Sequence, residues 1–563
     1  MLHSCLERCA MRVTLAAAGC LACVGWTAAH AQVPIQDRPI TRPLEPPGFL
    51  PPEQPEAFPL PPVERLAPDV EEMPRYLEVK GFAFEGNTVF SNEVLQTVAA
   101  PYAGRKVNRA DLEQLRQNLT VYYVERGYIN SGALLPEDFY REGIVHFHIV
   151  EGRLEEVRAK GLGRLRESYL TQRLVQGDQP LNVNTLQERF QLLLTDPMFA
   201  KINARLQPGA QPGEAILDVD VVRTRPYDLS VYVNNYLPPS IGGWAVGVDG
   251  VVRNLTGLGD TIGANFQQGE QGNRSYMIWG VMPVVYRTDI RLRYEREESV
   301  IVEEPLNVLD IGSTFQTAEI GVTHAFVDTI RRRFAMGLTY AYRQDSTTLL
   351  GEPFSFVPGE PSGTSRVNAL RFEQDYLQRW DIQSFALRST FTFGRTNVEP
   401  TALLSPFAPS QQYFAWLGQA QFTRAVLANG TTVTLRGNVQ LTPDQLVPIE
   451  KVALGGVGSV RGYRENQVVR DQGYDVTLEF RYPLRLPEAL QLYVIPFMDY
   501  GQAWNQGQSA SRQQLWSVGL GFNLQYRGLL AELYYGRRLI QPEIQTTGNL
   551  QDDGIQFQLT YRF

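Results

Sequence analysis

Few residues of this 563-residue chain have the types and spacing that chemistry at a protein site requires. His146 and His148 lie two apart on one face of a predicted strand, where two imidazoles could bind one metal ion. Because the sequence offers no third ligand nearby, we interpret this face as solvated. The chain contains no Gly-Lys dipeptide, and hence no phosphate-binding P-loop, and it lacks Gly-x-Ser-x-Gly and His-Glu-x-x-His motifs. The sequence thus predicts no catalytic residue, no metal and no cofactor, and we expect a protein that is not an enzyme.

The N-terminal segment has the composition of a secretory signal peptide. Arg8 and Arg12 precede an apolar stretch over residues 13–26, and Ala29-His30-Ala31 has small residues at its first and third positions. We predict a signal peptide over residues 1–31 that is cleaved after Ala31. The apolar stretch is too short for a transmembrane anchor. A lipoprotein signal is the other alternative, but the Leu or Val expected before its cysteine is missing.

Cysteine usage and charge exclude several classes of site. All four cysteines (Cys5, Cys9, Cys20, Cys23) lie within the predicted signal peptide, so the mature chain would have neither disulfides nor thiolate-bound zinc. The net charge of −8 gives no basic stripe for nucleic acid. The mean hydropathy of −0.22, with no further apolar run of about 18 residues, argues against a helical membrane protein. This value does not exclude a membrane β-barrel, because the hydropathies of its lipid-facing and lumen-facing residues average to a near-neutral value.

The elements that would position a site begin after a proline-rich linker over residues 32–74. Residues 33–74 hold 13 of the 36 prolines, which prevents a helix there and predicts an extended tether. Two units with the order β-α-α-β-β follow, over residues 75–152 and 153–224. The sequence predicts strands over residues 77–84, 128–135, 144–150, 154–160, 199–207 and 215–222, and helices over residues 91–100, from Asn108, 168–175 and 184–194. Each unit would be a small α+β domain whose sheet keeps a free edge.

Residues 225–563 alternate between apolar and polar side chains, as strands between two media do. The last nine residues are apolar at every odd position from Ile555 to Phe563. Runs of 9–11 residues match transmembrane strands, and aromatic residues recur as an interfacial girdle requires (Trp504, Tyr534, Tyr535, Tyr561). At about 21 residues per strand and connection, the segment accommodates about sixteen strands, an even number that closes a barrel. We therefore predict a mainly β protein with a sixteen-stranded antiparallel transmembrane barrel.

Five motifs, in order along the chain, resemble those of one family. Leu454-Gly455-Gly456 through Ser459-Val460-Arg461-Gly462-Tyr463-Arg464-Glu465 is similar to the sixth-loop segment of two-partner secretion transporters, the ShlB/FhaC/HecB-like haemolysin secretion/activation proteins. The other four are Phe497-Met498-Asp499-Tyr500-Gly501, Gly127 to Ser131 with Leu135-Pro136, Val150 to Arg153, and Asn254 with Gly257 to Asp260.

The resemblance implies two periplasmic polypeptide-transport-associated (POTRA) domains before the barrel and an inward-folded sixth loop around residues 453–472. The sixth-loop motif would consist of Val460, Arg461, Gly462 and Tyr463. Its partner motif on the barrel wall would consist of Phe497, Asp499 and Gly501. Arg461 would reach Asp499, since a guanidinium presents a planar fork that a carboxylate meets with two hydrogen bonds. Tyr561 and Phe563 would form the C-terminal signal read by the barrel-assembly machinery.

The resemblance also implies a function and a location. The chain would be a monomer in the outer membrane of a Gram-negative bacterium, where its POTRA sheet edges bind an unfolded TpsA-type exoprotein in extended form. The barrel would pass that haemolysin-, haemagglutinin- or adhesin-type exoprotein to the cell surface without nucleotide hydrolysis. The alternatives are an outer-membrane protein assembly factor of the same superfamily and a passive porin.

One departure from the family concerns the N-terminal helix that plugs the barrel in many members. The prolines of residues 33–74 prevent such a helix. Either the sixth loop alone closes the pore, or the proline-rich segment occupies it as an extended chain.

Overall fold

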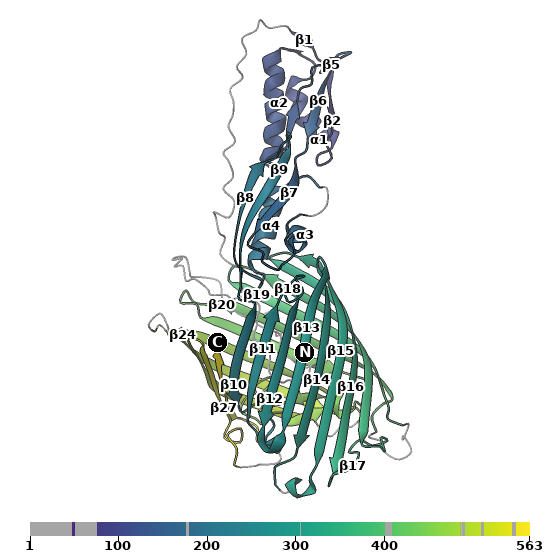
Figure 1. Ribbon diagram of the computed structural model, residues 1–563, viewed down its shortest axis with the longest axis vertical. Coiled ribbons are helices and arrows are strands. Elements are labelled where there is room, and N and C mark those ends of the chain that lie inside the picture. The colour runs from purple at the N-terminus through teal and green to yellow at the C-terminus, as the bar shows by residue number, and fades with distance from the viewer. Residues whose placement is uncertain are drawn as a thin grey trace, which may run out of the picture.

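The computed structural model describes residues 48–50, 76–175, 179–304, 306–399, 408–484, 486, 490–507, 512–542 and 548–563. The predicted signal peptide and nearly all of the predicted linker lie outside these residues. Figure 1 shows two small α+β units in line on one end of a large barrel. We call the barrel end that faces these units the proximal rim and the opposite end the distal rim.

The first α+β unit packs two helices on a small sheet. Its sheet order is β2-β6-β4, with β5 also pairing with β6, and β1 pairs separately with β3. Asn108 caps α2 with a reciprocal capping box to Asp111. The elements are β1 Leu77–Glu78, β2 Gly81–Glu85, α1 Asn92–Ala99, η1 Ala100–Tyr102, β3 Lys106–Val107, α2 Arg109–Val124, β4 Gly132–Leu134, β5 Tyr140–Arg141 and β6 Ile144–Val150.

Two strand predictions in this unit are wrong in extent. The strand expected over residues 77–84 is two strands, because the backbone of Val79 pairs with the 104–105 turn and Lys80 then donates to the Gly143 carbonyl. The strand expected over residues 128–135 covers only Gly132–Leu134. Its first half is a turn, in which the Tyr128 N–H donates to the Tyr123 carbonyl.

The second α+β unit repeats the arrangement with the sheet order β7-β9-β8. Its elements are β7 Arg153–Lys160, α3 Glu167–Leu174, α4 Val183–Leu194, β8 Phe199–Pro208 and β9 Glu214–Arg223. Leu170, Leu186, Phe190 and Leu217 are buried between helices and sheet. Among the described residues no helix is long and apolar enough to cross a membrane.

The barrel closes where its first strand, β10, pairs antiparallel with its last, β28. Sixteen strands form the wall, and the two-residue β17 adds a short ladder to β16, so the predicted fold class is confirmed. The strands are β10 Tyr227–Asn234, β11 Ala245–Arg253, β12 Thr261–Gly269, β13 Arg274–Val285, β14 Thr288–Val300, β15 Gly312–Asp328, β16 Arg332–Leu349, β17 Glu352–Pro353, β18 Thr364–Arg379, β19 Gln383–Thr396, β20 Gln412–Ala425, β21 Thr432–Leu441, β24 Gln472–Leu484, β25 Leu490–Trp504, β26 Gln513–Tyr526, β27 Leu529–Arg538 and β28 Ile555–Arg562.

Alternate side chains of each strand face opposite sides of the wall. On β28, Leu559 and Tyr561 are 41% and 48% exposed on the outer surface, whereas Gln556 is fully buried on the inner one. The outer surface is therefore apolar and the lumen polar, as a barrel in lipid requires. One aromatic residue predicted for the girdle faces the other way. Tyr534 points into the lumen, where its ring lies 5.1 Å from the Arg461 guanidinium, because it is one residue out of phase with the exposed Tyr535.

The histidine pair on β6 forms no metal site. Nδ1 of His146 lies 3.7 Å from the Glu85 carboxylate, and the side chains of Val145, Phe147 and Ile149 fill the core from the opposite face. Within the described part of the chain, no group of three or more His, Cys, Asp or Glu side chains could hold a metal ion.

Candidate functional site: a loop anchored inside the barrel

The sixth distal connection, residues 442–471, folds into the lumen instead of extending from the rim. We call it the inner loop. It contains a short 3₁₀ turn, η5 Pro448–Glu450, and a two-stranded hairpin of β22 Val452–Leu454 and β23 Val468–Arg470. Leu454, Val460 and Tyr463 are buried together with Ala503 and Leu515 of the wall. The hairpin thus presents its tip, residues 455–467, to strands β24 to β28.

Arg461 at the tip meets Asp499 of β25 through both carboxylate oxygens. The Arg461 Nε donates to Oδ2 at 2.8 Å and Nη2 donates to Oδ1 at 2.9 Å, which is the bidentate geometry of a planar fork. The Arg461 backbone N–H also donates to Oδ2, at 3.0 Å. Asp499 is completely buried and Arg461 is 3% exposed. The carboxylate therefore fixes the main chain and the side chain of the loop together.

Two further contacts hold the Arg461 guanidinium in place. Its Nη1 donates to Oε2 of Glu479 on β24 at 2.9 Å, and its Cζ lies 3.7 Å from the centre of the Phe497 ring. With Asp499 these groups surround one cation with two carboxylates and an aromatic face, which offsets the cost of removing the charge from water. Phe497 belongs to the predicted wall motif, whereas no motif in the sequence marks Glu479.

Glycines let the tip touch the wall directly. Gly462 has φ of +87°, and a Cβ there would lie 2.5 Å from the carbonyl oxygen of Gly536 on β27. A Cβ on Gly501 would lie 3.0 Å from Cγ2 of Val460 and 3.1 Å from Cδ1 of Leu454. Side chains at either position would push the loop off the wall.

Tyr463 is fully buried, and its hydroxyl closes the contact with the distal ends of β26 and β27. The hydroxyl donates to the Ile540 carbonyl at 2.6 Å and accepts from the Trp516 N–H at 3.0 Å. The Gly462 carbonyl accepts from Nε of Arg538 at 2.6 Å, beside the tyrosine ring. The four predicted loop residues and the three predicted wall residues therefore form one continuous contact.

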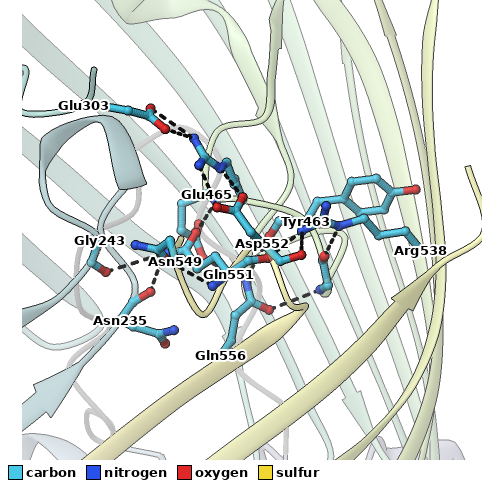
Figure 2. A network of polar contacts seen from close by, with 12 residues as sticks. Asn235, Gly243, Glu303, Tyr463, Glu465, Arg538, Asn549, Gln551, Asp552 and Gln556 are labelled. Atoms are coloured by element: carbon cyan, nitrogen blue, oxygen red, sulfur yellow. Dashed lines mark hydrogen bonds and ion pairs between the residues drawn. The ribbon is translucent and has the colours of Figure 1, made fainter. Parts of the chain in front are cut away.

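Beyond the predicted residues, the tip is tied to three other distal connections (Figure 2). Arg464 pairs with Asp552 in the connection between β27 and β28 through two hydrogen bonds of 2.6 and 2.8 Å, and with Glu303 between β14 and β15 at 2.7 Å. Gln551 accepts from the Glu465 N–H at 2.8 Å and donates to the Asn235 carbonyl, which follows β10. The sequence alone does not indicate these partners. They lie in connections outside the predicted motifs, and their approach to the tip depends on the closed barrel.

The C-terminal residues lie on the outer surface of the last strand. The rings of Tyr561 and Phe563 meet edge to face with centres 5.0 Å apart, and Phe563 is 56% exposed. The Phe563 N–H donates to the Leu229 carbonyl of β10. Both residues are thus far from the inner loop and available from outside the barrel.

The motifs in the first unit lie at the joint between the two units. Glu151 accepts hydrogen bonds from the Thr88 and Val89 N–H groups, both at 2.8 Å, and from the Tyr123 hydroxyl at 2.9 Å. Burial, and then the hydrogen bond to Glu151, raises the pKa of Tyr123, so the phenol stays protonated and donates. Asn130 donates to the Gly213 carbonyl of the second unit at 2.7 Å.

The Asn254–Asp260 turn joins the second unit to the proximal rim. The Asp260 carboxylate accepts from the Leu255 and Thr256 N–H groups, which fixes the turn. The outward Gly257 carbonyl accepts from the Arg166 N–H at the start of α3, at 2.9 Å. A Cβ on Gly259 would lie 2.1 Å from the Tyr169 ring of α3, so the glycine leaves room for that ring.

Comparison with known proteins gives the same picture along most of the chain. A family model described as haemolysin secretion/activation protein ShlB/FhaC/HecB matches residues 213–524, and a ShlB-type POTRA domain model matches residues 77–152. The haem/hemopexin transporter protein HuxB of Haemophilus influenzae is 22% identical over 76% of this chain and 77% of its own. The haemolysin transporter protein HpmB of Proteus mirabilis is 21% identical over 88% and 87%.

Solved structures share the fold. CdiB from Escherichia coli superposes with a TM-score of 0.69 at 19% identity, covering 89% of this chain and 93% of that one. CdiB from Acinetobacter baumannii superposes with a TM-score of 0.63 at 16% identity, covering 93% and 95%.

Proposed function

The chain belongs to the ShlB/FhaC/HecB family of haemolysin secretion/activation proteins, and from this premise we propose how its parts move a partner protein. It is an outer-membrane transporter of two-partner secretion, with POTRA domains in the periplasm and a transmembrane barrel. The proximal rim is then the periplasmic one and the distal rim the cell surface. The partner is a secreted exoprotein of the TpsA type, the class that covers haemolysins and contact-dependent inhibition toxins.

The buried Arg461–Asp499 pair carries the mechanistic part of the proposal. A loop that fills the lumen must be held in one arrangement until transport begins, and must then move aside. We propose that Arg461 and Asp499, with Val460, Gly462, Tyr463, Phe497 and Gly501, are this lock. The bidentate geometry and complete burial of Asp499 support the assignment, because such a pair fixes direction as well as distance.

Substitution of Arg461 tests the lock. Arg461→Ala should abolish secretion while the barrel still inserts, and Arg461→Lys should restore little, since an ammonium cannot form the two-pronged contact. Secretion is measured as the exoprotein recovered in the medium, and insertion as the heat-modifiable band on a denaturing gel. Arg388→Ala is the control, because Arg388 also pairs with a barrel carboxylate, Asp375, but lies on β19 away from the tip. Normal secretion by Arg461→Ala would refute the role.

We further propose that the free sheet edges of the POTRA domains bind the exoprotein before it enters the lumen. The outer strands β2, β4, β7 and β8 have unpaired sides in their sheets, and an extended chain can add to such an edge through main-chain hydrogen bonds. Folding at the cell surface would then draw the chain outward without nucleotide. In this proposal the protein catalyses no reaction, which agrees with a family of transporters.

The rival proposal is an assembly factor for outer-membrane proteins. Two POTRA units, instead of a longer series, favour secretion. Depletion of the protein distinguishes the two, since loss of one exoprotein from the medium supports secretion and loss of many barrel proteins from the membrane supports assembly.

A further inference from the structure

A second part of the inner loop rests on a region of the wall that the Arg461 contact does not reach. Leu446 and Val447, on the arm that leads from β21 into the loop, are fully or almost fully buried. They pack in a recess of the otherwise polar lumen, lined by Val367, Ala369, Val398, Tyr413 and Ala415. An apolar recess inside a water-filled barrel needs a cover, and this arm provides it.

At the end of the same arm, Glu450 meets two arginines from the wall. Its Oε1 accepts from Nη1 of Arg343 on β16 at 3.0 Å and from Nη2 of Arg371 on β18 at 3.3 Å. The neighbouring Ile449 carbonyl accepts from the same Arg343 nitrogen at 3.1 Å. Glu450 is 2% exposed, and the side chains of Arg343 and Arg371 are 0% and 6% exposed. The arm therefore brings one buried carboxylate to two buried cations.

The wall alone does not neutralise these two arginines. Glu319 on β15 lies 2.9 Å from Nη1 of Arg371 and 3.6 Å from Nη2 of Arg343, and it also lies 3.7 Å from Arg293. Glu295 pairs with Arg293. These ion pairs of the described residues join three arginines to two wall carboxylates, and Glu450 supplies the third negative charge.

Several N–H groups of Arg343 and Arg371 lack an acceptor among the described residues. Within the described part of the chain, Nε and Nη2 of Arg343 and Nε of Arg371 have no hydrogen-bond partner, although all three are buried. Buried guanidinium donors without acceptors are costly, so this place favours additional acceptors, carboxylate oxygens above all.

This contact is separate from the Arg461 lock. Glu450 is held by β16 and β18, and Arg461 by β24 and β25. Strands β19, β20 and β21 lie between these two groups in the wall. The loop is therefore attached at two points on the barrel circumference, and release of one leaves the other in place.

We propose that the arm Leu446–Glu450 is a second anchor of the inner loop, and that Glu450 covers an anion site formed by Arg343 and Arg371. When the arm leaves its recess, the site becomes available to carboxylates in the lumen, such as acidic side chains of a passing polypeptide. This goes beyond the proposed function, because it concerns ion and peptide binding by the barrel itself and can be measured with no exoprotein present.

Bilayer recording of the purified full chain tests the proposal. In a KCl gradient, Glu450→Gln should raise the chloride-to-potassium permeability ratio about twofold or more. The reason is that Arg343 and Arg371 lose the negative charge that the arm of the inner loop brings to them. Hexaglutamate should block this variant and hexalysine should not. Arg371→Gln combined with Glu450→Gln should return both properties to wild type. Glu352→Gln, an exposed position on β17, is the matched control and should change neither.

A second variant keeps the test informative if Glu450→Gln does not fold. Leu446→Ala with Val447→Ala leaves every charge in place but weakens the cover of the recess, so the arm should detach and anion selectivity should rise in the same direction. A wild-type permeability ratio in both variants would overturn the proposal, as would hexaglutamate block that persists without Arg371.

Discussion

At the scale of single residues, the tip of the inner loop is held by hydrogen bonds to both side chains and main chain of the wall. The Tyr463 hydroxyl donates to the Ile540 carbonyl and accepts from the Trp516 N–H of the distal wall, while the tyrosine ring is fully buried. The hydrogen bonds of this side chain therefore form only when the tip is in contact with the wall.

Tyr463→Phe should loosen the tip without changing its shape. The substitution leaves the Ile540 carbonyl without this donor and the Trp516 N–H without this acceptor, at a cost of about 1–3 kcal/mol. We expect faster hydrogen exchange in residues 455–467 and more frequent channel openings. Tyr535→Phe is the control, since that side chain is 52% exposed on the outer surface. Equal exchange in the two variants would contradict the seating role.

The sequence predicted Arg461, Asp499 and Gly462 through a family motif, and the structure brings all three together. It could not predict Glu479, Tyr534 or Asp552. These are ordinary strand and loop residues whose role depends on which wall position faces the tip. For Tyr534 the phase of the strand was misjudged by one residue, and a shift of one residue changes the side of the wall.

At the scale of elements, two short turns hold the three domains in line. Asn130 holds the first unit to its neighbour through the Gly213 carbonyl, and the Asn254–Asp260 turn fixes α3 to the barrel. The helices and strands of both units were predictable from capping residues and alternation. The connections were not, because the break at residues 79–80 arises from backbone pairing with distant turns, and the one at residues 128–131 is a local turn that continues from the end of α2.

Gly259→Ala should free α3 from the proximal rim. The added Cβ would lie 2.1 Å from the Tyr169 ring, and the backbone φ of +84° adds strain. Hydrogen exchange in residues 166–174 should rise, whereas exchange in the barrel strands should not. Gly272→Ala is the control, because Gly272 also has a positive φ but an added Cβ there would have no atom within 4 Å. It therefore shows the effect of backbone strain without a steric clash. Protection of α3 that is the same in both variants would argue against the joint.

At the scale of the whole molecule, the barrel is closed by more than its wall, because the inner loop occupies the lumen. Whether the proline-rich segment adds to this closure stays a prediction. Before Tyr76 the structure describes only Gly48–Leu50, and the Leu50 N–H donates to the Trp380 carbonyl between β18 and β19, at the proximal rim.

Deletion of residues 33–70 separates the two forms of closure. If the inner loop alone seals the pore, the deletion should leave the bilayer conductance unchanged, because the anchors of Arg461 and Glu450 remain. A large increase would mean that the proline-rich segment is a plug. The Arg461→Ala variant, recorded in parallel, shows how large a conductance the assay detects when the loop itself is released.

The seam between β10 and β28 also sets an order of assembly. Ser230 and Arg562, which pair across it, are separated by most of the barrel sequence, so this ladder closes late. The tip of the inner loop depends on the same late elements, since Arg538, Asp552 and Gln556 all belong to the last two strands or the connection between them. A growing barrel that lacks these strands has no complete seat for the tip. The lumen can therefore be sealed only as the final step of insertion, after the wall is complete.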